Sequence, residues 1–192
     1  MIEALLPAIK EGLLENTVKE KALSNIENNL KTDLRGQENT KYRLPVSDGR
    51  FAGEPGNSMW KPDETFVPKK HNPEGLPWKN ILETNGVSGI SYENGKPNFS
   101  PVARAAVKID DFTANRDTNF SQADEKLATQ WTKDNHDGKS WTPSEISKYR
   151  KDNDLSWHEW ADMKTMELVP QKVHGNITHS GGISAYKKLH GI

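Results

Sequence analysis

Three of the chain's six histidines lie close together near its C-terminal end. They are His158, His174 and His179, and Glu159 follows the first of them directly. A neutral imidazole can bind a divalent metal ion through a ring nitrogen. Near neutral pH it is also a better proton acceptor than a carboxylate, because its unperturbed pKa is ~6.5 against ~4.3 for Glu. These residues could therefore bind a metal ion, accept a proton from water, or do both.

The elements expected around these histidines are two strands and a helix. Residues 155–170 predict two short strands joined by a turn at 161–164. Pro170 then opens a helix that is expected to run through Ile177 and to stop at Gly181-Gly182. A histidine on a strand that faces two histidines from a following helix would form a small metal site.

The spacing of the four side chains restricts this arrangement. His174 and His179 are five residues apart, which places them ~140° apart on an ideal helix. Both can reach one ion only if the helix ends or distorts between them, and Gly175 permits this. His158 and Glu159 point to opposite faces of a regular strand, so only one of them enters the site unless the strand is bulged.

The chain that precedes this segment divides into two predicted parts. Residues 1–40 predict a helical arm or a linker, because apolar residues such as Leu6, Ile9 and Leu13 recur at helical spacing. Residues 41–192 are expected to form the main domain. Its strand-strand-helix core is expected at about residues 155–190.

Turn-forming residues dominate the first half of the main domain. Seven of the 11 prolines and seven of the 14 glycines fall within residues 41–100, so long helices are not expected there. Short strands are predicted near residues 66–67, 87–92 and 102–109. Asn94-Gly95 predicts a hairpin, because both central residues of a type I′ turn need a positive φ.

Helical patterns return after Asp117. An apolar stripe runs from Phe120 to Trp131 and ends before residues 135–138. Thr142-Pro143-Ser144-Glu145 then forms a capping box with proline at the first helical position, which predicts a helix over about residues 143–151.

Composition narrows the class of protein. Only 33% of the 192 residues are hydrophobic, but six Trp, five Phe and four Tyr can bury a modest core. A net charge of −1 excludes a strongly basic nucleic-acid coat protein, and the lack of cysteine excludes disulfides and thiolate metal sites. No apolar stretch approaches the ~18–20 residues of a membrane span, and no secretory signal is visible. We expect a loop-rich α+β fold.

The C-terminal pattern resembles the HNH/endonuclease VII superfamily, and within it the WHH-type nuclease toxins of bacterial polymorphic toxin systems. The residues that carry the resemblance are Trp157-His158-Glu159, Met166-Glu167-Leu168-Val169-Pro170, His174 and His179-Ser180-Gly181-Gly182. Upstream, residues 56–58, 90–101 and 112–116 are similar to the leading part of such domains, so the resemblance spans roughly residues 53–188.

The resemblance implies a ββα-metal (HNH, or His-Me finger) nuclease with one divalent ion, which could be Mg, Mn, Ni or Zn. It places His158 as general base and His174 and His179 as metal ligands. Many relatives have a second histidine where this chain has Glu159, so which of His158 and Glu159 is the base and which the ligand stays open.

The implied function is that of an antibacterial endonuclease, with DNA as the expected substrate and a cognate immunity protein as partner. Such a toxin would be secreted or delivered and would act in the cytoplasm of the target cell. Lys164, Lys172 and Lys187 are candidate contacts to nucleic-acid phosphates. The alternatives are an RNase toxin and a binding module in which the histidines hold a structural zinc.

Overall fold

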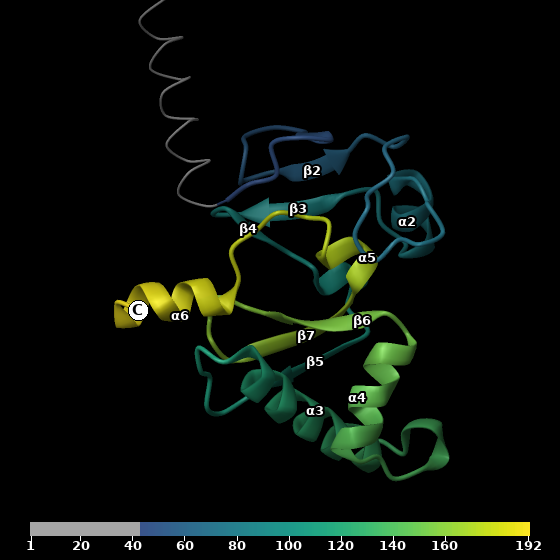
Figure 1. Cartoon of the computed structure of the whole chain (residues 1–192), viewed down its shortest axis with the longest axis vertical. Helices are drawn as coiled ribbons and strands as arrows, with labels where there is room; N and C mark the ends of the chain where they lie inside the picture. The colour runs from purple at the N-terminus through teal and green to yellow at the C-terminus, as the bar shows by residue number, and fades with distance from the viewer. Residues whose placement is uncertain (1–42) are drawn as a thin grey trace, which may run out of the picture. The chain divides into compact units, whose positions relative to one another are not determined.

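The computed structural model describes residues 43–192, which contain two small antiparallel sheets and five α-helices (Figure 1). The expected α+β class is thus confirmed. The helical arm expected at residues 1–40 lies outside the described residues.

The first sheet has the strand order β1-β2-β3-β4 and is antiparallel throughout. Its strands are β1 (Gly49–Phe51), β2 (Met59–Pro62), β3 (Ile90–Glu93) and β4 (Lys96–Pro97). Helix α2 (Trp78–Thr84) lies between β2 and β3 in the chain. The predicted hairpin joins β3 to β4, and its central residues Asn94 and Gly95 both have positive φ, 51° and 72°.

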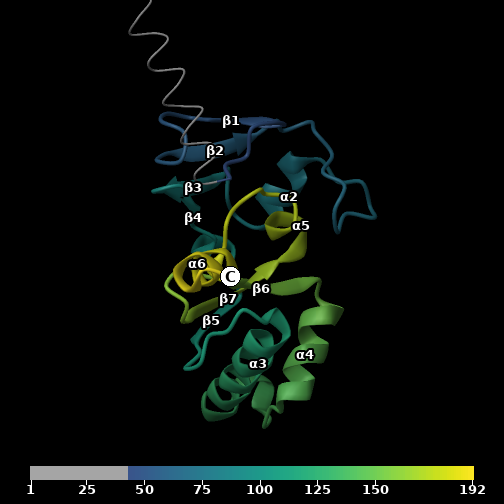
Figure 2. The same ribbon diagram turned by 60° about the vertical axis from the view of Figure 1, so that its left-hand side comes forward.

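The second sheet has the order β5-β7-β6, so that β6 is an edge strand. Its strands are β5 (Ala105–Lys108), β6 (Leu155–Glu159) and β7 (Thr165–Pro170). Helices α3 (Arg116–Lys133) and α4 (Pro143–Asp152) lie against one face, and α5 (Gln171–His174) lies against the other (Figures 1 and 2). Helix α6 (Gly182–His190) ends the fold, and two 3₁₀ turns, η1 (Ser100–Val102) and η2 (His136–Gly138), complete it.

The pleat of β6 and β7 separates two hydrophobic cores. Trp157 and Leu168 are paired across the strands and pack with α3 and α4. Val169, the next residue along β7, packs instead with α2, α5 and the first sheet. Successive side chains of a strand point to opposite faces, so one two-stranded ribbon serves both cores.

A buried ion pair fixes the helices to the second sheet. Asp124 of α3 accepts hydrogen bonds from Arg150 Nε and Nη2 of α4, both at 2.7 Å, and from Trp157 Nε1 of β6 at 2.8 Å. Asp124 and Arg150 are 4% and 8% exposed. Because one carboxylate satisfies donors from two other elements, it sets how α3, α4 and β6 meet.

Both predicted helices of the middle region are confirmed. Helix α3 covers the stripe from Phe120 to Trp131, and α4 begins at Pro143 with both hydrogen bonds of the capping box formed between Thr142 and Glu145. The two strands predicted within residues 155–170 are confirmed as β6 and β7.

Two local predictions are wrong. Residues 66–67 form no strand. The Phe66 N–H bonds to the Asp63 carbonyl and the Phe66 carbonyl accepts from Trp78 N–H, so neither group is left for a strand partner. Gly181-Gly182 does not stop a helix but begins α6. A Cβ on Gly182 would lie 2.6 Å from the Trp160 carbonyl oxygen, so this glycine allows close packing.

The helix after Pro170 is also shorter than predicted. It ends at His174 and does not run through Ile177, because Asn176 N–H turns back to the Val173 carbonyl with the tighter spacing of a 3₁₀ turn. His174 and His179 are therefore not on one helix. None of the helices within residues 43–192 has the length and apolar character needed to cross a membrane.

Candidate active site

The register of β6 decides where its polar side chains point. His158 pairs with Glu167 and Glu159 pairs with Met166 in an unbroken antiparallel ladder with β7. His158 therefore faces α5, while Glu159 faces α3. As expected for a strand without a bulge, the two neighbouring residues lie on opposite faces of the sheet, so of the two only His158 enters the histidine cluster. The Glu159 side chain points towards α3, where Asn119 binds it, and it reaches the cleft only at the edge.

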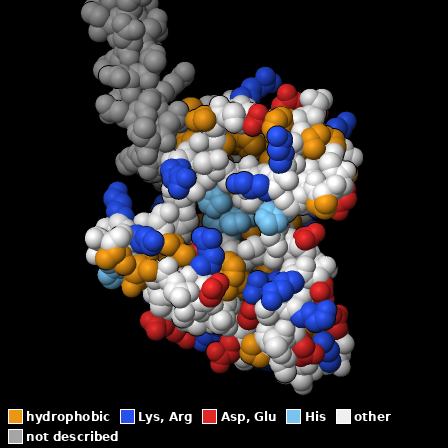
Figure 3. Space-filling view, in the orientation of Figure 1, with side chains coloured by type: hydrophobic (Ala, Val, Ile, Leu, Met, Phe, Trp, Pro, Cys, Tyr) orange, Lys and Arg blue, Asp and Glu red, His pale blue; other side chains and the backbone are white. Residues whose placement is uncertain are grey.

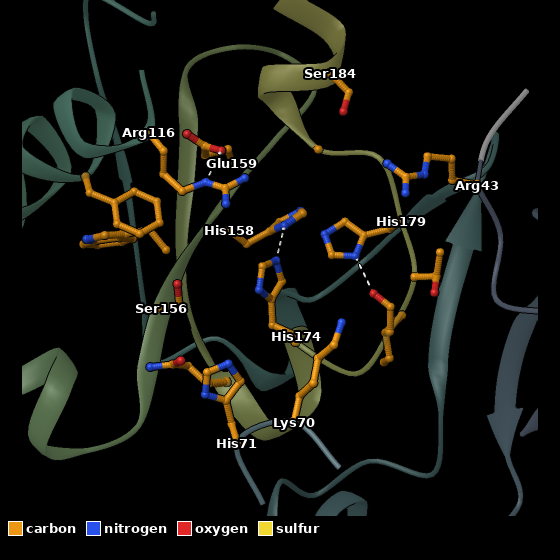
Figure 4. Close-up of a pocket in the computed structure, with 17 residues that line it drawn as sticks. Arg43, Lys70, His71, Arg116, Ser156, His158, Glu159, His174, His179 and Ser184 are labelled. Atoms are coloured by element: carbon orange, nitrogen blue, oxygen red, sulfur yellow. Dashed lines mark hydrogen bonds and ion pairs between the residues drawn. The ribbon is translucent and has the colours of Figure 1, made fainter. Parts of the chain in front are cut away.

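The three histidines of the C-terminal segment converge on one point (Figure 4). His158 comes from β6, His174 from the last position of α5, and His179 from the loop before α6. One ring nitrogen of each lies within 4.8 Å of the others, and His158 Nδ1 is 3.1 Å from His174 Nε2. The end of α5 at His174 removes the angular restriction that a single continuous helix would impose.

Two contacts fix the histidine rings. His179 Nδ1 lies 2.8 Å from the Ile177 carbonyl oxygen, which can only accept, so Nδ1 carries the proton and Nε2 is left with a lone pair. The fully buried Phe99 ring makes T-shaped contacts with all three rings, with centroid distances of 4.8 Å to His158 and 5.3 Å to both others.

Burial keeps the imidazoles neutral. Desolvation lowers the pKa of His158 well below its usual value, and the neighbouring His174 and His179 lower it further. The pKa of His174 is lowered to about 3 and that of His179 is also lowered, again mainly by burial. All three rings therefore offer a nitrogen lone pair at neutral pH.

These properties fit a divalent metal ion. Two nitrogen ligands on a tetrahedral ion are ~3.3 Å apart at the usual metal–nitrogen distance of ~2.0–2.1 Å, close to the 3.1 Å between His158 and His174. A carbonyl that holds the second ring nitrogen, as Ile177 does for His179, is the usual support of a metal-binding histidine. The cluster could hold a metal ion.

Glu159 is a buried carboxylate at the edge of the same site. Its Oε1 accepts a 2.9 Å hydrogen bond from Asn119 Nδ2, and its Oε2 lies 3.5 Å from Arg116 Nε. Burial raises the pKa of Glu159, while the bonds from Asn119 and Arg116 oppose that rise. Asn119 is itself fully buried and bonded to Thr113, so it holds the carboxylate in one orientation.

The histidines and Glu159 line an open cleft of about 520 Å³ whose rim is basic. The space-filling view shows the imidazoles in a hollow with Lys and Arg side chains around it (Figure 3). The cations that line the cleft are Arg43, Lys70 and Arg116, and Glu159 is the one acidic residue among the described residues of the lining. The cleft suits a polyanion that must reach the histidines.

Sequence reasoning did not identify most of this rim. His71, which was not singled out, lines the cleft, as do Arg43, Lys70 and Arg116. The three lysines singled out lie elsewhere: Lys164 in the β6–β7 turn, Lys172 in an ion pair with Glu74, and Lys187 on α6. A histidine or arginine in a polar loop carries no spacing signal, so only the fold reveals that these residues meet.

Comparison with known proteins adds an independent finding. Residues 89–181 match a family model described as the DNase/tRNase domain of colicin-like bacteriocins. A search of curated proteins finds no match. The matched stretch includes all three clustered histidines and Glu159 but ends short of α6, and it leaves out residues 43–88. The match supports a nuclease toxin domain.

Proposed function

We propose that this protein is a metal-dependent endonuclease of the HNH type that acts as an antibacterial toxin. The observation that carries the proposal is the convergence of three neutral imidazoles at the floor of a cleft lined by cations. The match to a nuclease toxin family over residues 89–181 supports the same reaction class. The order β6, β7, α5 agrees with the ββα-metal motif that the sequence resemblance implies.

In this proposal His158, His174 and His179 hold one divalent ion. When bound, that ion supplies Lewis-acid chemistry, neutralising charge on the scissile phosphate and on the departing oxygen. His158 takes the role of ligand because its Nδ1 belongs to the nitrogen cluster. The sequence left open which of His158 and Glu159 is the ligand and which the base. With His158 as the ligand, proton transfer falls to Glu159.

Glu159 is proposed as the group that accepts a proton from the attacking water. A carboxylate whose pKa is raised by burial is a better proton acceptor than an exposed one. Asn119 holds Oε1, which leaves Oε2 to receive the proton once Arg116 turns to the substrate. Water would add to phosphorus as it loses this proton, and the bond from phosphorus to the departing oxygen would break.

The substrate is proposed to be a nucleic acid, because the cleft offers cations for backbone phosphates, and to be cut with little sequence preference. DNA is the proposed form, as the sequence resemblance implies. A nuclease toxin implies delivery into a target cell, action in its cytoplasm, and a cognate immunity protein in the producing cell. A structural zinc site is the less favoured alternative. Such sites normally have four protein ligands, whereas three histidines meet here beside an open cleft.

Cleavage of plasmid DNA, with structured RNA in a parallel arm, tests this function. The wild type is measured with Mg²⁺, Mn²⁺, Ni²⁺ or Zn²⁺ and with a chelator, beside His174→Ala, Glu159→Gln and the exposed control Lys133→Ala. We expect chelator-sensitive cleavage by wild type and control, and at least a ~100-fold lower rate for the other two variants. Wild type that is inactive with every ion would refute the nuclease assignment. Cleavage of RNA alone would make the protein an RNase toxin.

A further inference from the structure

One wall of the cleft comes from a loop that lies outside the stretch matched by the nuclease family. Residues 68–76, here called the His71 loop, follow the first sheet's β2 and precede α2. Lys70 and His71 of this loop line the cleft beside His174 (Figure 4). Both side chains are exposed.

The backbone of the His71 loop is hydrogen-bonded to the segment between His174 and His179. Lys70 N–H donates to Asn176 Oδ1 at 2.9 Å, and Asn176 Nδ2 donates back to the Lys70 carbonyl at 2.6 Å. Asn176 Nδ2 also donates to the carbonyl of Lys172 near the end of α5. Asn176 therefore joins the loop to the segment between His174 and His179.

Further contacts hold the loop on the C-terminal side of the Lys70–Asn176 hydrogen bonds and within the loop itself. Lys172 Nζ forms a 2.8 Å ion pair with Glu74. The buried Asn72 donates to the carbonyls of Pro68 and Leu76 and accepts from Leu76 N–H, which closes the loop on itself. The backbone around His71 is thus held by contacts on both sides.

His71 occupies its place at a conformational cost. Its φ is 52°, in the left-handed region that residues with a side chain rarely adopt. Its ring also lies so close to Gly175 that a Cβ there would be 2.8 Å from His71 Cδ2.

We propose that Lys70 and His71 bind a backbone phosphate of the nucleic acid next to the one that is cleaved, and that Asn176 is the positioning residue that holds them there. The Lys70 ammonium supplies charge and the His71 ring supplies a directional hydrogen bond. Contacts of this kind fix the register of the strand without reading its sequence. The proposal rests on the proposed function, because it takes the substrate to be a nucleic acid.

The test measures binding, so that it does not depend on cleavage. Fluorescence anisotropy of a labelled 12-base-pair duplex, DNA in one arm and RNA in the other, is recorded in chelator over a series of salt concentrations. The variants are Lys70→Ala, His71→Ala, His71→Gln and Asn176→Ala, with Lys79→Ala as an exposed lysine outside the cleft.

For Lys70→Ala we expect affinity to fall about 3- to 10-fold and the slope of log K against log salt to become shallower by about 0.9, the value for one lost phosphate contact. His71→Ala should weaken binding, and His71→Gln should restore part of it. Asn176→Ala should shift the slope as Lys70→Ala does, an effect that a purely structural loss would not produce. Lys79→Ala should match wild type.

Three outcomes would overturn the proposal or the function beneath it. If the Lys70 and His71 variants bind with the affinity and salt slope of wild type, the proposed phosphate contact is wrong, even if wild type cleaves nucleic acid. If wild type binds but cleaves neither substrate with any ion, the nuclease function is wrong. The proposed phosphate contact is then still judged by the salt dependence of the Lys70 and His71 variants. If wild type binds neither duplex, the proposed phosphate contact is wrong, and the nuclease function is judged by the cleavage assay alone.

Discussion

His158, His174 and His179 are buried together, and this burial is the main factor that decides their protonation. Each ring loses hydration, and His158 and His174 lie next to other rings that would repel a second charge. The folded protein therefore favours the neutral rings. The unfolded chain titrates its histidines near ~6.5.

This difference makes the metal-free protein sensitive to acid. Because the folded pKa values are lowered, the unfolded chain binds more protons below pH ~6.5, so stability is full above that pH and falls as the pH drops towards the folded pKa, about 3 for His174. The loss is at most about 1.4 kcal/mol per pH unit for each histidine. Denaturant unfolding in chelator between pH 7.5 and 4.5 measures it. His174→Gln should show a weaker dependence, and equal curves for variant and wild type would contradict the account.

The candidate metal ligands could be predicted from the sequence, whereas the cations around them could not. His158, His174 and His179 lie within one short segment, so local pattern and family resemblance were sufficient. Arg116 and His71 reach the same cleft from other elements, through contacts between residues far apart in the sequence. No spacing rule connects such residues before the fold is known.

At the scale of elements, the junction of α3, α4 and β6 depends on a charge. Asp124 satisfies two donors of Arg150 and the indole N–H of Trp157 in a site that water barely reaches. Removing the carboxylate leaves a buried guanidinium and a buried N–H without their partner. Breaking one side of a buried pair costs more than an exposed pair contributes.

Asp124→Ala should therefore destabilise the protein by about 3–5 kcal/mol. The matched control is Asp152→Ala, which breaks the exposed pair with Lys148 on α4 and should cost only about 0.3–0.5 kcal/mol. Urea unfolding at neutral pH compares the two. An Asp124 variant that is no less stable than the control would show that the buried pair contributes little.

Elements with strong local signals were predicted well, and those set by distant contacts were not. The α4 capping box needs only residues 142–145, and its two bonds form as expected. The role of Gly182 depends on the Trp160 carbonyl oxygen packed against it. The end of α5 likewise involves Asn176, whose side chain bonds to the backbone carbonyl of Lys70 in the His71 loop. Such contacts are invisible to local patterns.

At the scale of the molecule, the binding of a polyanion depends more on where the charges lie than on the net charge. The chain carries 26 basic and 27 acidic residues, yet Arg43, Lys70 and Arg116 all line the cleft that holds the histidines. A cleft in which charges of one sign predominate concentrates an oppositely charged substrate locally. A nearly neutral protein can therefore attract a polyanion to this cleft.

Binding of a DNA duplex should accordingly depend on salt in proportion to the cations of the cleft. Three phosphate contacts predict a slope of about −2.7 in log K against log salt, and Arg116→Ala should make it shallower by about 0.9. Lys133→Ala, at the end of α3 and outside the cleft, should leave it unchanged. A slope near zero, or equal effects of the two variants, would place the binding surface elsewhere.

The convergence of three imidazoles on one ion is tested most directly by calorimetric titration of the metal-free protein with Ni²⁺ and Zn²⁺. We predict one ion per chain for wild type, and a loss of affinity of at least ~100-fold when His158, His174 or His179 is replaced by alanine, while His136→Ala, a histidine stacked on Trp131, binds like wild type. Unchanged binding by the three alanine variants, or no binding by a folded wild type, would contradict the assignment of these histidines as a metal site.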